Sequence, residues 1–222
     1  TNDYYGQISN LDSDLKLLFR NINTYGDLSS SYQEDTDHKL LGSLMLNLKY
    51  PLIKSNVSSK NYLTPLVSLR YSPKKGLNFK NKKTLIKFQD LLMMDRINNK
   101  TVESGVAATV GIEYINQDSL NNDKFKFGVA VNMRNNEDDH LPLSSSFGKK
   151  TSDLIGYSGI NITENLSFNY DFSIDQNLSE TNYSLISANY KNDSFKTSFE
   201  YMEKSNFIGD ESYLNNYTEL EI

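Results

Sequence analysis

Few side chains in this sequence are of the types that bind metal ions or act in catalysis. The run 137–140, three acidic residues followed by a histidine, offers oxygen and imidazole ligands but lacks the glycine and the spaced ligands of a calcium loop. His38 lies near Asp35 and Asp37 and forms the second group of this kind. We interpret both groups as solvent-exposed surface residues, so neither predicts a metal site.

The sequence offers no support for a hydrolase. It has no cysteine, which excludes thiol nucleophiles, zinc ribbons and disulfides. No serine stands in a Gly-x-Ser-x-Gly motif beside a histidine, so a catalytic triad has no basis. We predict a protein that is not an enzyme and needs no cofactor. An outer-membrane phospholipase barrel stays open as an alternative, but it requires a serine and a histidine on adjacent strands, and both histidines are predicted to lie in loops.

Composition narrows the class of protein. The 222 residues are 37% hydrophobic with a mean hydropathy of -0.57, which is low for a large packed interior. The net charge of -5 and the absence of a basic stripe make nucleic acid an unexpected partner. No run approaches the roughly 18 apolar residues of a membrane helix. A membrane β-barrel is compatible with this composition, because only alternate residues of each strand face lipid.

Alternation of apolar and polar residues predicts about ten strands. They are expected at 14–21, 40–50, 63–71, 105–114, 124–134, 154–162, 166–175, 182–190, 195–201 and 213–222, with a weaker strand at 24–33. Pro51 has no amide hydrogen and is predicted to end the second of these strands. Pro65, inside the next one, predicts a sheet edge, a bulge or a locally loosened ladder.

The lengths of these strands favour a membrane barrel. They run to about 9 to 11 residues, enough to cross a bilayer at a tilt, whereas strands of soluble proteins centre on about 5 to 6. The predicted loops of the second half alternate between short and longer ones, as in transmembrane barrels. We predict an all-β, antiparallel up-and-down transmembrane β-barrel, with residues 1–222 forming part of a single barrel domain. The alternative is a soluble β-rich binding protein, whose apolar faces would pack against a second sheet.

Four short segments form an ordered set of motifs. Their residues are Pro51, Pro65, Phe88, Asp90, Asp95, Arg96, Ser152, Asp153 and Gly156. In this order they resemble the strand ends, the phenylalanine-acidic-leucine and aspartate-arginine segment, and the serine-aspartate-x-x-glycine strand of the LPS-assembly protein family LptD, also called organic solvent tolerance protein. The sequence departs from that pattern at 92–94, where Leu-Met-Met replaces an aromatic-glycine element, and it lacks the paired cysteines of better-known members.

The resemblance implies a function and a location. It implies the central part of an outer-membrane barrel of roughly two dozen or more strands in a Gram-negative bacterium. Such a barrel receives lipopolysaccharide from the periplasm and inserts it into the outer leaflet. The implied partners are lipopolysaccharide, an LptE-like lipoprotein plug inside the barrel, an LptA-like periplasmic bridge protein and outer-membrane lipid. The family's N-terminal periplasmic domain and its later strands are expected to lie outside these 222 residues.

The polar strand faces are predicted to line the lumen of this barrel. The candidate substrate-path residues are Glu113, Lys124, Lys126, Arg134, Asn169 and Asp171. Burying the cations of one strand face in a dry core would be costly, so we expect that face to contact water and to meet phosphate and sugar groups. Asp95 and Arg96 are expected to form an ion pair or a turn anchor that holds a loop against the lumen wall. A generic porin, which would also have a charged lumen, is the alternative function.

Overall fold

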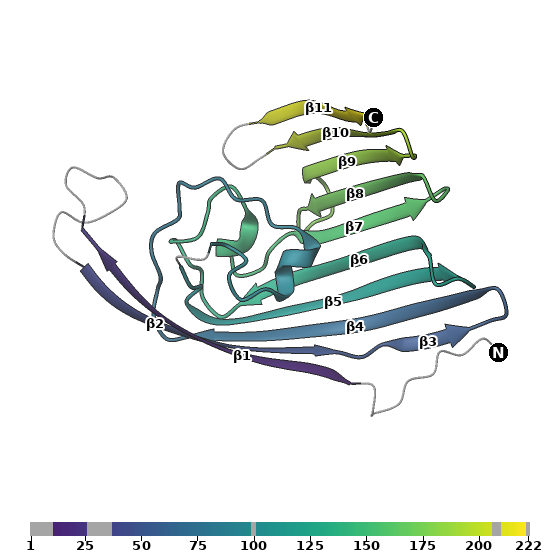
Figure 1. Ribbon diagram of the computed structural model, residues 1–222. Helices are drawn as coiled ribbons and strands as arrows, with labels where there is room; N and C mark the ends of the chain where they lie inside the picture. The colour runs from purple at the N-terminus through teal and green to yellow at the C-terminus, as the bar shows by residue number, and fades with distance from the viewer. Residues whose placement is uncertain (1–10, 26–36, 99–100, 206–209, 221–222) are drawn as a thin grey trace.

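A computed structural model describes residues 11–25, 37–98, 101–205 and 210–220. In this part of the chain, eleven strands form one antiparallel up-and-down sheet that curves without closing on itself (Figure 1). The strands are β1 (Asp12–Thr24), β2 (Asp37–Lys49), β3 (Leu52–Ser55), β4 (Ser59–Ser72), β5 (Gly105–Asp118), β6 (Asp123–Arg134), β7 (Leu154–Asn161), β8 (Leu166–Ile174), β9 (Thr181–Lys191), β10 (Phe195–Lys204) and β11 (Glu211–Leu220). The described helices are two short 3-10 turns, η2 (Phe88–Leu92) and η3 (Ser146–Gly148), neither of which could cross a membrane.

The all-β, antiparallel prediction is confirmed, and the strands predicted within the described residues are present. Most of them extend a few residues beyond the predicted bounds, and β3 was not predicted. His38 lies in β2, so its predicted loop position is wrong: its strand begins at Asp37, ahead of the apolar run that marked it in the sequence. The weaker strand expected at 24–33 lies almost wholly outside the described residues.

Two prolines interrupt the ladder at one point. β2 ends at Lys49 and β3 begins at Leu52, so Pro51 separates two strands that both pair with β4. Pro65 lies on β4 opposite this break, where Tyr50 donates its amide hydrogen to the Pro65 carbonyl at 3.1 Å. Pro65 still pairs with Ile112 of β5, so it is not at a sheet edge. Of the three arrangements that the sequence allowed, the locally loosened ladder is the one observed.

The two faces of the sheet have opposite chemistry. On β5, Val106, Val110 and Ile112 point to the convex side and are exposed, whereas Ala107 and Thr109 point to the concave side and are buried. The same division runs through the paired positions of β4 and β6, because residues opposite one another in a ladder share a face. The apolar side chains of these strands therefore form the exposed convex surface, which inverts the usual arrangement of a soluble protein.

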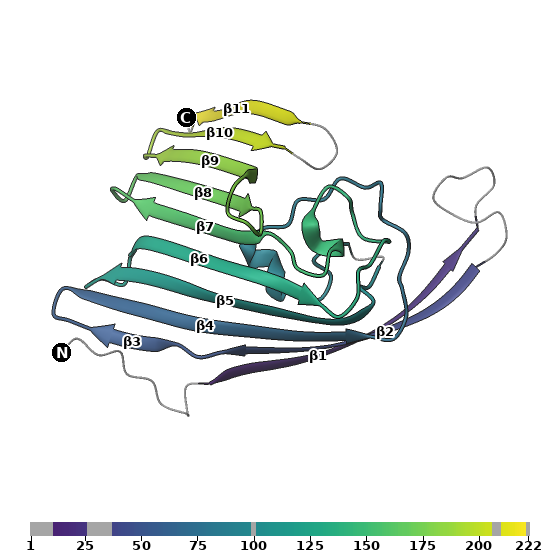
Figure 2. The same cartoon turned by 180° about the vertical axis from the view of Figure 1, so that it is seen from behind.

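Two long connections fold into the concave side of the sheet. They are the β4–β5 connection, described at 73–98 and 101–104, and the β6–β7 connection at 135–153, and we call them the infolded loops (Figures 1 and 2). The turns at the opposite end of the sheet, at 56–58, 119–122, 162–165 and 192–194, are short. One half of the concave side is thus covered by protein, and the other half is open.

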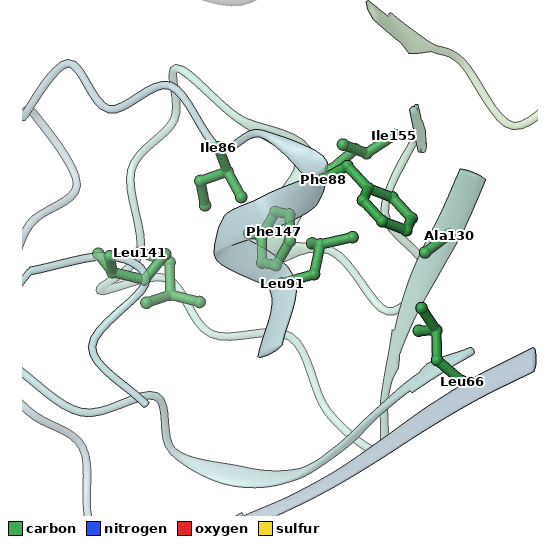
Figure 3. Close-up of a cluster of buried hydrophobic side chains, with 9 residues drawn as sticks. Leu66, Ile86, Phe88, Leu91, Ala130, Leu141, Phe147 and Ile155 are labelled. Carbon is green, nitrogen blue, oxygen red and sulfur yellow. The ribbon is translucent and has the colours of Figure 1, made fainter. Parts of the chain in front are cut away.

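The hydrophobic core lies between the infolded loops and the concave face (Figure 3). Leu66, Ala130 and Ile155 enter it from β4, β6 and β7. The loops supply Ile86, Phe88, Leu91, Ile97, Leu141 and Phe147. Six of the nine residues of this cluster therefore come from the loops and three from the strands.

A glycine makes room for the most prominent of these contacts. Phe88 of η2 packs on Tyr157 of β7 with 5.1 Å between ring centroids. Both rings lie over Gly128, where a Cβ would be 2.6 Å from the Tyr157 ring and 2.9 Å from the Phe88 ring. No side chain fits at that position without displacing the aromatic pair, so Gly128 allows η2 to approach the sheet closely.

Candidate functional site

A buried carboxylate joins the infolded loops to the sheet. Glu103, just before β5, contacts Arg96 of the same loop with Nε to Oε1 at 2.5 Å and Arg134 of β6 with Nη1 to Oε2 at 2.7 Å. Arg70 of β4 is further away, with Nη1 at 3.8 Å from Oε1. All four side chains are buried. One negative charge therefore lies among three positive charges that come from different segments.

The electrostatic balance of this cluster favours the ionised carboxylate. Burial by itself would raise the pKa of Glu103, because it removes water from the charged form. The positive charges of Arg96, Arg70 and Arg134, with the hydrogen bond from Arg96, outweigh this effect and hold the pKa of Glu103 well below its ordinary value. Glu103 is consequently a fixed anion over the whole physiological pH range.

Arg96 connects the loop to two strands. Its Nη1 donates to Thr109 Oγ1 of β5 at 3.2 Å, and its Nη2 donates to Asn132 Oδ1 of β6 at 2.9 Å. Its guanidinium also lies over the ring of Phe147, 4.5 Å from the centroid. The predicted role of Arg96 as a loop anchor agrees with this geometry.

The expected ion pair between Asp95 and Arg96 is wrong, because Arg96 turns inward to Glu103 while Asp95 is exposed. Both residues lie in a turn after η2, and only Arg96 enters the buried cluster. The acidic partner of Arg96 is Glu103, which lies seven residues further along the chain.

Arg134 was expected to contact water, and this expectation is also wrong. It lies on the polar strand face, as predicted, but its side chain is fully buried. Its Nη2 donates to the Ser104 carbonyl at 2.7 Å and lies 3.7 Å from Asp138. Glu103 and Asp138 of the infolded loops compensate the charge of Arg134. Burial of this charge is therefore less costly than burial of an unpaired cation.

The remaining substrate-path candidates lie on the concave face. Glu113 accepts a hydrogen bond from the Tyr157 hydroxyl at 2.6 Å, and Asp171 pairs with Lys87 of the infolded loop at 3.1 Å. Asn169 pairs with Gly159 across the ladder on the same face. Glu113 and Asp171 therefore border the loops, whereas Asn169 is exposed to solvent.

Two candidate cations lie nearer the short turns. Lys124 pairs with Asp118 at 3.3 Å and Lys126 with Asp123 at 3.2 Å, and all four side chains are partly exposed. Such pairs contribute little to stability, because water competes for both charges. Lys124 and Lys126 can therefore leave their partners for an incoming anion, which the buried Arg134 cannot do.

Lys124 borders a large hollow in the open half of the concave face. The hollow has a volume of about 1090 Å³ and lies near the short turns at 119–122, 162–165 and 192–194. Its wall combines three lysines and two acidic residues with carboxamide, hydroxyl and tyrosine side chains, including Lys191, Lys196, Asp123, Glu164 and Asn189. Side chains of these types donate and accept hydrogen bonds and attract anions, which suits a hydrated polar ligand.

The other motif residues have structural contacts. Asp90 accepts a hydrogen bond from the Lys87 amide at 2.9 Å and so holds the first turn of η2. Ser152 Oγ accepts from the Asn132 amide at 2.9 Å and ties the β6–β7 connection to β6. Asp153 accepts from Ser173 and Asn182, each at 2.9 Å. Gly156 lies under the Phe172 ring on the convex face.

The acidic run at 137–140 also makes structural contacts. Asp138 is buried and accepts hydrogen bonds from the amide and hydroxyl of Ser104. Asp139 pairs with Lys75 at 2.5 Å, and this hydrogen bond lowers the pKa of the Asp139 carboxyl. Among the described residues, no group of three potential ligands is arranged for a metal ion.

Sequence reasoning missed Glu103, Arg70 and Tyr157 as members of the site. Arg70 lies on the same strand face as Ser68 and Ser72, and this alternation is the sequence signal that could have placed it on the concave face. Glu103 lies in a short polar stretch with no periodicity, so nothing in the sequence distinguishes it from a surface acid.

No protein-family model matches this chain, and no curated protein matches it in sequence.

Proposed function

We propose that this protein is part of an outer-membrane β-barrel of the LptD type, which moves lipopolysaccharide into the outer leaflet of a Gram-negative bacterium. The observation that carries the proposal is the inverted polarity of the sheet, with an apolar convex face and a polar concave face. The choice of lipopolysaccharide as the substrate rests on the resemblance of the ordered sequence motifs to the LptD family. The same proposal includes an LptE-like lipoprotein plug, an LptA-like periplasmic bridge protein and surrounding membrane lipid as partners.

The convex face has the dimensions of a membrane-facing surface. The apolar positions of β5 run from 106 to 114, nine residues that span roughly 25 to 30 Å along the strand. Aromatic pairs lie near the short-turn ends of the strands: Tyr114 with Phe125 at 6.1 Å, and Tyr190 with Phe195 at 5.4 Å. Outer-membrane barrels have such aromatic girdles at the edge of their apolar band.

The connections support the same orientation. Bacterial outer-membrane barrels have short turns on the periplasmic side and longer loops on the outside. By this rule the turns at 119–122, 162–165 and 192–194 would face the periplasm, and the infolded loops would enter from the outside. The polar hollow would then open toward the periplasm, the side from which lipopolysaccharide arrives.

The edges of the sheet favour a larger assembly. Within the described residues, β1 pairs only with β2, and β11 only with β10. Free strand edges in a bilayer would leave backbone groups without hydrogen bonds, which is costly. We infer that further barrel strands pair with β1 and β11.

A photocrosslinking experiment tests this function. A benzophenone side chain is placed at Lys124, which borders the concave hollow, and at Phe127, which lies on the convex face of the same strand. We expect a lipopolysaccharide adduct at Lys124 that disappears when transport is de-energised. Absence of that adduct in a protein that folds in the outer membrane would contradict a transport role.

A generic porin is the second candidate, because a loop folded into the lumen also narrows the channel of a pore. Ion conductance in planar bilayers, together with no energy-dependent adduct at Lys124, would favour the porin. A soluble binding protein would need a cover for the convex face, and the described residues form one sheet only.

A further inference from the structure

A hollow of about 470 Å³ interrupts the convex face over strands β6 to β9. The backbone register gives its layout. Phe125 pairs with Ile160, which pairs with Phe168, so these three form a row of large apolar side chains. In the next row, Ser158 pairs with Tyr170. The convex surface therefore has a wall of large side chains beside a position with a very small one.

The hollow is present where two of the convex side chains are short. Ser158 of β7 and Ser184 of β9 both line it, with Ile186 beside them. The nearby Gly156 leaves no such space, because the Phe172 ring lies directly over it and is itself buried. The space beside a small residue is thus occupied by the Phe172 ring at Gly156, whereas it stays open at Ser158 and Ser184.

The lining of the hollow is mainly apolar, and its polar side-chain groups are those of Ser158, Asn169, Tyr170 and Ser184. None of the described residues that line the hollow is charged, and the apolar part of the lining dominates. The backbone groups of β7, β8 and β9 are already paired in the ladders, so they offer little to a peptide strand. A ligand without polar groups loses nothing in such a site and gains from burial between aromatic and aliphatic walls.

We propose that this hollow binds one hydrocarbon chain of a membrane lipid, which lies against Ser158 and Ser184 between Phe168 and Ile186. The inference rests on the proposed function, because it requires the convex face to lie in a bilayer. It goes further by assigning one position on that face where a lipid chain is held. The convex side chains of β5, such as Val106 and Val110, lie outside this hollow. The volume is within the usual range of small-molecule sites, about 300 to 1,000 Å³.

The test uses the protein reconstituted in phosphatidylcholine vesicles that contain a phosphatidylcholine with a photoreactive diazirine on its acyl chain. After illumination, mass spectrometry measures the adducts on each residue. We expect adducts on Ile160 and Ile186 to exceed those on Val106 and Val110 several-fold, because these valines lie on the same face outside the hollow.

Three variants make the measurement specific. Ser158→Phe fills the hollow and is expected to reduce labelling of Ile160 and Ile186 to the level of β5. Ser184→Phe fills it from the other side and gives the same result if Ser158→Phe does not fold. Val110→Phe adds the same ring to the convex face away from the hollow, and it is expected to leave the labelling of Ile160 and Ile186 unchanged.

The possible outcomes separate this inference from the proposed function. Equal labelling of Ile160 and Val110, or labelling that survives Ser158→Phe, would overturn the chain site while leaving the convex face in lipid. Labelling confined to concave residues such as Asn189, with none on Val110 or Ile160, would overturn the proposed function together with the site.

Discussion

Arg96 and Glu103 form a two-point contact in the interior of the protein. Arg96 Nε lies 2.5 Å from Glu103 Oε1, and Arg96 Nη2 lies 2.8 Å from Oε2. Their side chains are 1% and 2% exposed. The planar guanidinium fits the carboxylate at both nitrogens, which gives a fixed geometry as well as charge compensation. This pair decides where the β4–β5 connection lies on the concave face.

Replacing Glu103 by Gln is expected to destabilise the protein by about 3–5 kcal/mol, because it leaves buried arginine charges uncompensated. Urea unfolding of the detergent-solubilised protein measures the loss, and protease cleavage within 73–98 reports release of the loop. Glu137→Gln is the matched control, since Glu137 is an exposed acid in the other infolded loop. Equal stability of the two variants would contradict a role for Glu103 as an anchor.

The contribution of Glu103 is expected to resist acid. Its pKa in the folded protein lies below the ordinary value of 4.5, so its stabilising effect is fully present above that pH. The effect is lost only as the pH falls from 4.5 toward the much lower folded pKa. Urea unfolding at a series of pH values should therefore give a constant difference between wild type and Glu103→Gln at pH 5 to 8. A difference that already shrinks between pH 7 and 5 would contradict the depressed pKa.

Gly128→Ala is expected to cost about 1–3 kcal/mol, because the new Cβ would push on the Tyr157 and Phe88 rings. Thermal unfolding followed by circular dichroism measures this loss. Gly42→Ala is the control in another strand, where the nearest atom to a new Cβ is 3.8 Å away. If both variants unfold at the same temperature, the close approach of η2 to the sheet is not a constraint.

Lys124→Ser combined with Lys126→Ser is expected to lower lipopolysaccharide crosslinking to a benzophenone side chain at Asn189, which lines the same hollow. No loss of stability is expected, because both lysines are partly exposed and weakly paired. Arg134→Ser is expected instead to lower the stability of the protein or to release the loop, because it removes a buried charge that pairs with Glu103. Crosslinking yield and urea unfolding are measured on both variants. Unchanged crosslinking in the double lysine variant would remove these lysines from the substrate path.

The sequence predicted most of the sheet. Side chains of a strand alternate between two faces, so the apolar residues at 106, 108, 110 and 112 reveal both the strand and its apolar face, which the structure places on the convex side. The same rule predicted that Lys124, Lys126 and Arg134 share the polar face of β6. Pro51 predicted a strand end correctly, because the lack of an amide hydrogen is a local property.

The candidate site was predicted only in part. The sequence predicts an ion pair between Asp95 and Arg96 or a turn anchor, and only the anchoring role agrees with the contacts of Arg96. Local spacing favours neighbours in the sequence, whereas the buried contacts of Arg96 reach Thr109 and Asn132 on two strands. Asp138 was similarly interpreted as a surface acid, although it holds Ser104 across the two infolded loops.

The amino-acid sequence by itself determined which residues form strands and which face each side chain takes, since period-2 alternation and proline act within a few residues. Only the tertiary structure decided that two long loops fold into the concave side and bury Arg70, Arg134 and Glu103. A polar strand face has the same pattern whether water or a folded loop covers it. The difference depends on distant carboxylates and cations that compensate each other, and that compensation arises only when the loops and the sheet come together.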